Sequence, residues 1–159
     1  MIINHPIKPF YNKNSKILIL GSFPSVKSRE QMFFYGHKQN RFWRVISTIY
    51  GYIEPKSIDE KKALLKENKL AVWDVIASCD IVGSSDSSIK NVIPNDINII
   101  LNEANIEKII VNGKTAEKFY NKYIKHQINR VAICLPSTSP ANATWSIEKL
   151  IDQWKRELT

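Results

Sequence analysis

Four short runs of aliphatic residues constrain the fold of this chain more than any other feature. They occupy residues 16–21, 70–76, 107–113 and 130–136. Three of the runs end at Gly or Pro, and all four are rich in Val, Ile and Leu. Continuous apolar runs of this length are typical of strands that are buried on both faces of a sheet.

Segments with helical periodicity alternate with these runs. We expect helices over 41–50, 59–67, 94–104, 115–125 and 143–158. Asn40 can cap the first helix, Gly51 can end it, and Pro94 suits a first helical turn. Residues 77–93 are expected to form a loop. The alternation predicts a three-layer α/β/α sandwich around a mostly parallel four-stranded sheet, in one domain over residues 1–159.

Composition narrows the class of protein. The chain has 159 residues, of which 43% are hydrophobic and 24% charged, as in an ordinary globular domain. No apolar run approaches the roughly 20 residues of a bilayer span, and the first residues do not form a signal peptide. We therefore expect a cytoplasmic protein with no membrane partner, and a monomer because one small domain suffices. The net charge of +8 favours a polyanionic partner such as DNA, although a solvated lysine surface would give the same sum.

The two cysteines argue against a metal site. Cys79 and Cys134 are far apart, and neither belongs to a C-x-x-C pair. Zinc sites and iron–sulfur clusters need about four ligands, so we expect no metal and no cofactor. Both cysteines lie in apolar stretches and are interpreted as small buried hydrophobes.

The carboxyl ends of the expected strands are where a binding site should form. The first strand ends in GSFPS, residues 21–25, where Gly21 and Pro24 shape a tight turn that exposes backbone N–H groups. The aromatic residues Phe33, Phe34 and Tyr35 follow. We expect at least one of the two phenylalanines to pack in the core, whereas Tyr35 is a candidate for stacking on a base.

The fourth strand leads into LPSTSPAN, residues 135–142. Two prolines there bracket small hydroxyl residues, which can present hydroxyl and N–H donors to phosphates. Taken alone, such a string is most often a turn.

Together these segments resemble the uracil-DNA glycosylase superfamily. The similarity is carried in family order by LILGSFPS (18–25), YGHKQNRFW (35–43), VWDVIASC (72–79), VNGKTAEKF (111–119) and LPSTSPAN (135–142). The chain is most similar to the branch of DNA-deoxyinosine, or hypoxanthine-DNA, glycosylases and to the mismatch-specific uracil/thymine glycosylases. The resemblance implies a DNA partner that contains a deaminated base.

One departure shifts the expected substrate. Mismatch uracil glycosylases carry an Asn in the first motif that positions the attacking water, and Phe23 holds that place here. In the deoxyinosine branch, the resemblance implies that Asn40 takes over the catalytic role. The chain is therefore expected to favour hypoxanthine, with xanthine or uracil as further substrates.

The resemblance and the residue types assign roles to the site. We expect Asn40 to orient water or contact the base, and His37 to serve as a possible donor to the leaving group. The expected base pocket consists of Gly21, Ser22, Phe23, Pro24, Tyr35 and Ser137. The expected DNA contacts are Ser25, Arg41, Lys114, Thr138, Ser139 and Asn142.

Structural interpretations stand beside these roles. Asn40 and Asn142 can both cap helices, and Arg41 can pair with an acid on its own helix. Asp74 and Asp86 have no evident partner in the sequence, which favours a structural role for both. No lysine is placed to form a Schiff base, so we expect a monofunctional enzyme. A uracil-specific mismatch glycosylase and a catalytically silent DNA- or nucleotide-binding relative remain alternatives.

Overall fold

The computed structural model describes all residues from Met1 to Thr159 and contains a four-stranded parallel sheet. Its strands are β2 (Ile17–Gly21), β3 (Leu70–Asp74), β6 (Lys108–Asn112) and β7 (Ile133–Leu135), in the order β3-β2-β6-β7. All neighbours run parallel, with Leu18 opposite both Ala71 and Ile109. The four expected strands and the α/β/α fold class are therefore confirmed.

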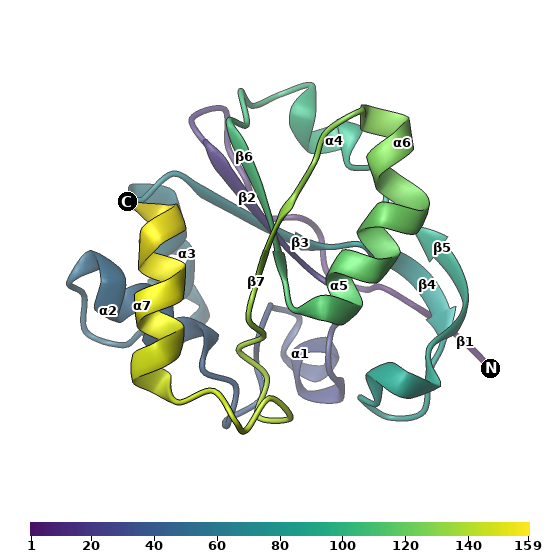
Figure 1. Cartoon of the computed structure of the whole chain (residues 1–159), viewed down its shortest axis with the longest axis horizontal. Helices are drawn as coiled ribbons and strands as arrows, with labels where there is room; N and C mark the ends of the chain where they lie inside the picture. The colour runs from purple at the N-terminus through teal and green to yellow at the C-terminus, as the bar shows by residue number, and fades with distance from the viewer.

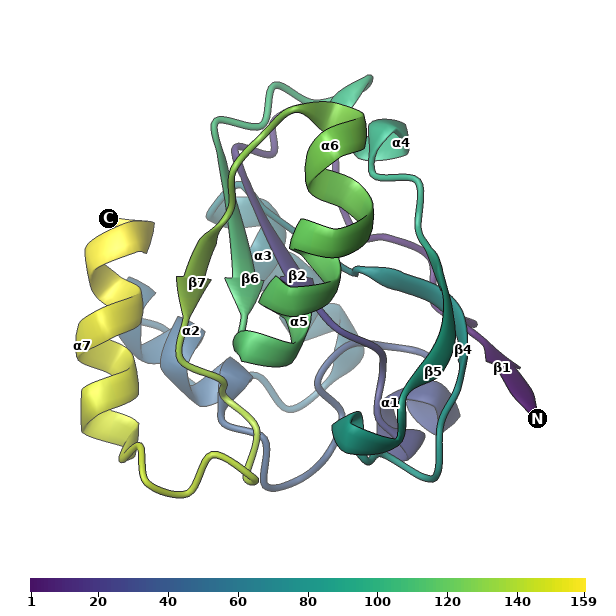
Figure 2. The same cartoon turned by 45° about the vertical axis from the view of Figure 1, so that its right-hand side comes forward.

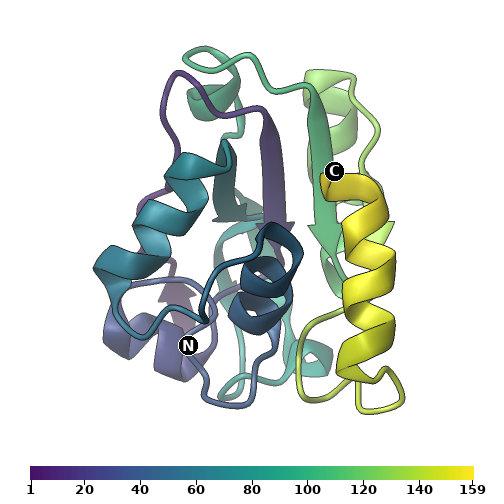
Figure 3. The same ribbon diagram turned by 90° about the vertical axis from the view of Figure 1, so that its left-hand side faces the viewer.

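Helices cover both faces of this sheet (Figures 1 and 2). On one side lie α2 (Phe42–Tyr50), α3 (Ile58–Glu67) and α7 (Ile147–Leu158). On the other side lie α5 (Lys114–Phe119), the π-helical turn η2 (Tyr120–Ile124) and α6 (Lys125–Ile128). Figure 3 shows α2 and α7 side by side, and these two helices contact each other through their apolar faces. None of the helices has the length and apolar character that crossing a membrane would require.

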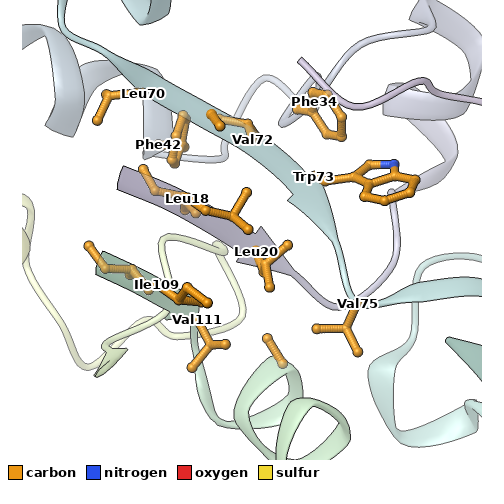
Figure 4. Close-up of a cluster of buried hydrophobic side chains, with 14 of the residues drawn as sticks. Leu18, Leu20, Phe34, Phe42, Leu70, Val72, Trp73, Val75, Ile109 and Val111 are labelled. Carbon is orange, nitrogen blue, oxygen red and sulfur yellow. The ribbon is translucent and has the colours of Figure 1, made fainter. Parts of the chain in front are cut away.

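One hydrophobic cluster of 35 buried residues joins the layers. Figure 4 shows Leu18, Leu20, Val72 and Val111 from the sheet gathered with Phe42 of α2. Trp154 of α7 meets the Phe42 ring edge-on at 6.1 Å between centroids. Burying aromatic side chains of this size contributes a large share of the stabilisation of such a core.

A second, smaller sheet was not expected. It contains β1 (Ile2–Asn4), β4 (Ile76–Asp80) and β5 (Lys90–Pro94), paired antiparallel in the order β1-β4-β5. The loop predicted over 77–93 is therefore shorter: β4 and β5 take up its two ends, and residues 81–89 connect them. Strand β5 lies at the edge of its sheet and exposes Lys90, Asn91 and Ile93, so its sequence shows no buried apolar run.

The expected helix over 94–104 was also wrong. Pro94 is the last residue of β5, where its missing N–H disturbs little of the ladder. The chain then turns through the buried Asn95, whose side chain donates to the carbonyls of Asp74 and Ile76. Only the single-turn helix α4 (Asn98–Leu101) follows.

Two further boundaries differ from expectation. Residues Val26–Gln31 form a short helix, α1, capped by Ser25, where no helix was predicted. Helix α7 begins at Ile147 rather than near 143, because the Ser146 hydroxyl accepts from the N–H of Lys149 and caps it.

Cys79 is buried as expected, whereas Cys134 is half-buried, and both are free thiols.

Candidate active site

A cavity of about 520 Å³ lies beyond the carboxyl ends of the parallel strands. Its lining includes the GSFPS turn, the strand-end residues Asp74 and Asn112, the serine loop 84–87 and residues 137–141. Tyr35, His37 and Asn40 also contribute. The structure therefore brings the two expected loops together. They meet because parallel strands point their carboxyl ends to the same edge of the sheet.

The floor of the cavity is built where β2 and β3 end side by side. Gly21 pairs with Asp74 in the register of the two strands. A Cβ atom on Gly21 would lie 2.4 Å from Oδ1 of Asp74 and 3.2 Å from the hydroxyl of Tyr35. Glycine is required here because both polar groups approach the backbone closely.

Asp74 is held by a histidine from the N-terminal segment. Nε2 of His5 lies 2.7 Å from Oδ2 of Asp74, and both side chains are at most 5% exposed. Nδ1 of His5 accepts from the N–H of Ile7 at 3.1 Å. In the neutral ring the proton is therefore on Nε2, which donates to the carboxylate. Oδ1 of Asp74 accepts no hydrogen bond from the chain, and the residue lines the cavity.

This pair was missed by the sequence analysis. The two residues are 69 positions apart, and His5 belongs to no motif. Three rings surround it: those of Phe23, Phe34 and Trp73, with centroids 5.8 to 6.4 Å away. An acidic residue at the end of a buried strand was the one available signal for Asp74.

The turn after β2 leaves two backbone donors free. Neither the N–H of Ser22 nor that of Phe23 donates to another group of the chain. The Phe23 side chain itself is buried beside His5, and Pro24 is buried too. Phe23 thus contributes to the cavity mainly through its backbone.

Tyr35 lines the cavity with its ring stacked on Phe42, 4.0 Å between centroids. Its backbone is left-handed (φ 53°), a conformation that orients the half-buried side chain at some cost in strain. The hydroxyl is buried without a hydrogen-bond partner, and burial raises the pKa of the phenol far above its usual range. Phe33 and Phe34 both pack into the core, as expected of at least one of them.

Asn40 belongs to a network that joins three elements. Its Oδ1 accepts from the N–H of Phe42 and from the hydroxyl of Thr138, each at 2.9 Å. Nδ2 of Asn112 donates to the same hydroxyl at 3.0 Å, and Oδ1 of Asn112 accepts from the N–H of Thr138. Asn40 thus accepts from the first N–H of α2, although the N-cap position itself is held by Arg41, and its Nδ2 has no partner in the chain. The residue also lines the cavity.

The prediction that Thr138 contacts DNA was wrong. The residue is completely buried, and its hydroxyl connects Asn40 to Asn112. Asn112 was missed by the sequence analysis. It is the last residue of β6, directly before Gly113, and a polar residue at the end of a buried strand could have indicated it.

Arg41 holds the loop after β7 instead of facing outward. Its guanidinium donates to the carbonyls of Ser139 at 3.0 Å, Asn142 at 3.1 Å and Trp145. Asn142 in turn donates through Nδ2 to the carbonyl of Ser137. These bonds direct the guanidinium of Arg41 into the loop instead of toward a phosphate, the contact that was expected of it. Asn142 does not cap α7, and its amide donates within the loop.

Three of the remaining candidates line the cavity and have partners within the chain, whereas Lys114 does neither. The hydroxyl of Ser25 accepts from the N–H of Ser28 at the start of α1, and that of Ser137 accepts from the N–H of Ser139. His37 is exposed at the cavity, with Nδ1 accepting from the N–H of Gln39. Lys114 is exposed and lines a neighbouring cavity of about 630 Å³ rather than this one.

Comparisons with known proteins identify the family of the chain. The Uracil DNA glycosylase superfamily profile matches residues 8–159. The chain belongs to this superfamily. It is a DNA glycosylase, an enzyme that hydrolyses the bond between a base and its deoxyribose.

Individual relatives are similar over most of the chain. A protein of Methanosarcina barkeri named hypoxanthine DNA glycosylase is 35% identical over 114 residues, 70% of this chain and 72% of that protein. A protein of Methanosarcina acetivorans with the same name is 31% identical over 137 residues, 85% of each. A solution NMR structure from M. acetivorans, provisionally named a uracil DNA glycosylase, superposes with a TM-score of 0.83 at 29% identity, covering 99% of this chain and 97% of that one.

No group of three or more His, Cys, Asp or Glu side chains in the structure could hold a metal ion. The polar groups of the cavity are instead single donors and acceptors at fixed positions. Such groups can bind a flat polar ring and stabilise charge that develops on it.

Proposed function

We propose that this glycosylase removes hypoxanthine from DNA, as a monofunctional enzyme without lyase activity. The main supporting observation is the floor of the cavity, where the free Oδ1 of buried Asp74 lies against Gly21, and the unpaired N–H groups of Ser22 and Phe23 follow directly in the same turn. Hypoxanthine presents an N1–H donor next to an O6 acceptor. The two sets of groups are complementary, and the relatives named hypoxanthine DNA glycosylases support the same substrate.

The same floor disfavours the undamaged parent base. Adenine carries a lone pair at N1, where hypoxanthine carries a proton, and an amino group in place of O6. In the orientation that suits hypoxanthine, the N1 lone pair of adenine would face the carboxylate, and its amino group would face the backbone donors. A site of unpaired buried polar groups rejects the mismatched ligand strongly. Xanthine and uracil also pair an N–H with a neighbouring carbonyl and are the further candidates.

The remaining residues suit an extruded nucleotide. Tyr35 would stack on the flipped base, and the N–H groups of Ser22 and Phe23 would stabilise the negative charge that its carbonyl gains as the glycosidic bond breaks. Nδ2 of Asn40 would contact the base or orient the water, and His37 would donate a proton to the leaving group. Ser25, Ser137, Ser139 and Lys114 would contact the DNA backbone around the opening.

The test uses duplexes that carry a single deoxyinosine, deoxyuridine, deoxyxanthosine or undamaged deoxyadenosine. After incubation, heating in alkali converts abasic sites into strand breaks. We expect the fastest release from deoxyinosine and none from deoxyadenosine. Breaks at deoxyuridine alone would replace hypoxanthine with uracil as the substrate, and no breaks in any duplex would leave a DNA-binding protein without activity.

Two variants refine the result. Asp74→Asn replaces one acceptor oxygen with a donor, and should lower the preference for deoxyinosine over deoxyadenosine by about 10- to 1000-fold. Asn40→Ala should slow excision by about 100-fold if this amide assists catalysis. The matched control is Asn105→Ala, an exposed asparagine outside the cavity. An Asn40→Ala rate equal to that of the control would remove Asn40 from the mechanism.

A further inference from the structure

Two carboxylates, and no others, belong to the cavity lining, and they occupy different depths. Asp74 is at the floor, buried and held by His5. Asp86 comes from the serine loop and is exposed at the opening. Pairs of carboxylates with contrasting surroundings commonly divide two chemical roles between them.

Asp86 is held in place although it is exposed. The loop that carries it is tied to α1 by two hydrogen bonds: Arg29 donates to the carbonyl of Gly83, and Ser84 accepts from the N–H of Val26, each at 3.0 Å. Asp86 itself begins a short 3-10 turn, Asp86–Ser88. The hydroxyl of Ser22, next to the free backbone donors, lies 3.4 Å from Oδ1 of Asp86. The carboxylate is therefore fixed beside the turn after β2.

The depth of Asp86 matches the position of the sugar, an argument that rests on the proposed function. When the N1 and O6 edge of a purine meets the floor, its N9 atom and the attached deoxyribose face the opening. Positive charge develops on this sugar in the transition state, which resembles an oxocarbenium ion. The turn GSFPS offers no side-chain carboxylate or amide to this charge, because Phe23 is an aromatic residue packed against His5.

We propose that Asp86 is a catalytic residue whose carboxylate faces C1′ of the flipped nucleotide, stabilises the oxocarbenium-like sugar and accepts a proton from the attacking water. The bond from C1′ to the base breaks, and its electron pair leaves with the base. The water oxygen forms the new bond to C1′, and its proton passes to Asp86 and then to solvent. The departing base takes up a proton, which balances the hydrolysis.

The surroundings of Asp86 suit this role. The protein around the opening raises the pKa of the carboxyl by desolvation, and the charge of Asp74 adds to the rise, while hydrogen bonds from Ser22 and Thr115 oppose it. Lys114, next to Thr115 on α5, lines the neighbouring cavity together with Asp86. A carboxylate with a raised pKa is a better proton acceptor, and it works only when deprotonated. Excision should therefore slow as pH falls through this pKa.

The first experiment measures single-turnover excision by Asp86→Asn on whichever base the wild type releases fastest. We expect the rate to fall by about 100-fold or more, with DNA affinity changed by less than about threefold, because the group acts in the transition state. Asp86→Asn should also lose the decline at acidic pH, whereas Asp86→Glu should retain it. Asp96→Asn, an exposed aspartate outside the cavity, is the control. An Asp86→Asn rate within about threefold of this control would overturn the proposal.

A second experiment needs no turnover. A duplex that carries a cationic pyrrolidine in place of the target nucleotide mimics the charged sugar, and a neutral tetrahydrofuran duplex is its uncharged counterpart. Wild type should prefer the cationic duplex by about tenfold or more, and Asp86→Asn should lose that preference. An equal preference in both proteins would overturn the proposal. The deoxyribose is common to all the candidate substrates. If the enzyme removes a base other than hypoxanthine, both experiments still test the role of Asp86.

Discussion

The floor and the wall of the cavity differ in whether their polar groups are hydrogen-bonded within the chain. At the floor, Oδ1 of Asp74 and the N–H groups of Ser22 and Phe23 have no partner in the chain. In the wall formed by residues 136–146, Thr138 is fully buried and Arg41 donates to three backbone carbonyls. Both regions look alike in sequence, as short segments that contain Pro and Ser and follow an apolar run.

This difference indicates that the floor binds the ligand and that the wall maintains the shape of the cavity. Polar groups without partners at a cavity surface are available to a ligand, whereas hydrogen-bonded groups keep a loop in one conformation. The wall has no regular secondary structure between β7 and α7, so it depends on Arg41 and Thr138 for its shape. Substitutions in the wall should therefore act mainly on stability, and substitutions at the floor mainly on excision.

The largest effect on stability is expected for Arg41→Met. Three carbonyls lose a charged donor, so we expect the free energy of unfolding to fall by about 2–4 kcal/mol, measured by denaturant titration. The control is Arg156→Met, which removes an ion pair to Asp152 between side chains that are each 65% exposed. That loss should be below about 1 kcal/mol. Equal losses would show that the wall does not depend on Arg41.

Gly21→Ala tests the floor. The added Cβ would collide with Asp74 and Tyr35, so we expect a loss of about 1–3 kcal/mol in stability together with excision slowed by about 100-fold. Gly36→Ala is the control, because there the closest atom is the flexible end of the Gln31 side chain. Normal excision by folded Gly21→Ala would contradict the geometry assigned to Asp74.

Thr138→Val probes the link between the two regions. The side chain keeps its shape but loses the hydroxyl that Asn40 and Asn112 share, at an expected cost of about 1–2 kcal/mol. Excision per folded molecule should fall by about threefold to tenfold as Asn40 becomes less ordered. Thr48→Val, at an exposed position of α2, should change neither quantity. If Thr138→Val changes stability and excision no more than Thr48→Val does, the wall and the floor are not coupled through this hydroxyl.

The smallest effect is expected for Ser139→Ala. Its hydroxyl accepts only from the N–H of Ala141 in an exposed turn, so the stability should change by less than about 0.5 kcal/mol. One lost hydrogen bond to a phosphate should weaken DNA binding by about twofold to tenfold, measured by fluorescence anisotropy at fixed salt. Unchanged affinity would remove Ser139 from the DNA interface.

Local patterns in the sequence were sufficient for the main sheet and for several helices. The runs at 16–21, 70–76, 107–113 and 130–136 each became a parallel strand. Asn40 accepts from the first N–H of α2 as its position indicated, although Arg41 holds the N-cap. These features are readable because burial on both faces and helix capping depend on a few neighbouring residues. The same patterns, with the topology rule for parallel sheets, placed the two site loops at one edge.

Partnerships across long stretches of the chain were decided by the tertiary structure alone. His5 meets Asp74 across 69 positions, Arg41 reaches Trp145 across 104, and Thr138 meets Asn40 across 98. A single sequence gives the type of each side chain but not the group that it will face after folding. Whether a polar residue is left free for a ligand or is bonded within the scaffold depends on that distant partner, and it could be determined only from the folded arrangement.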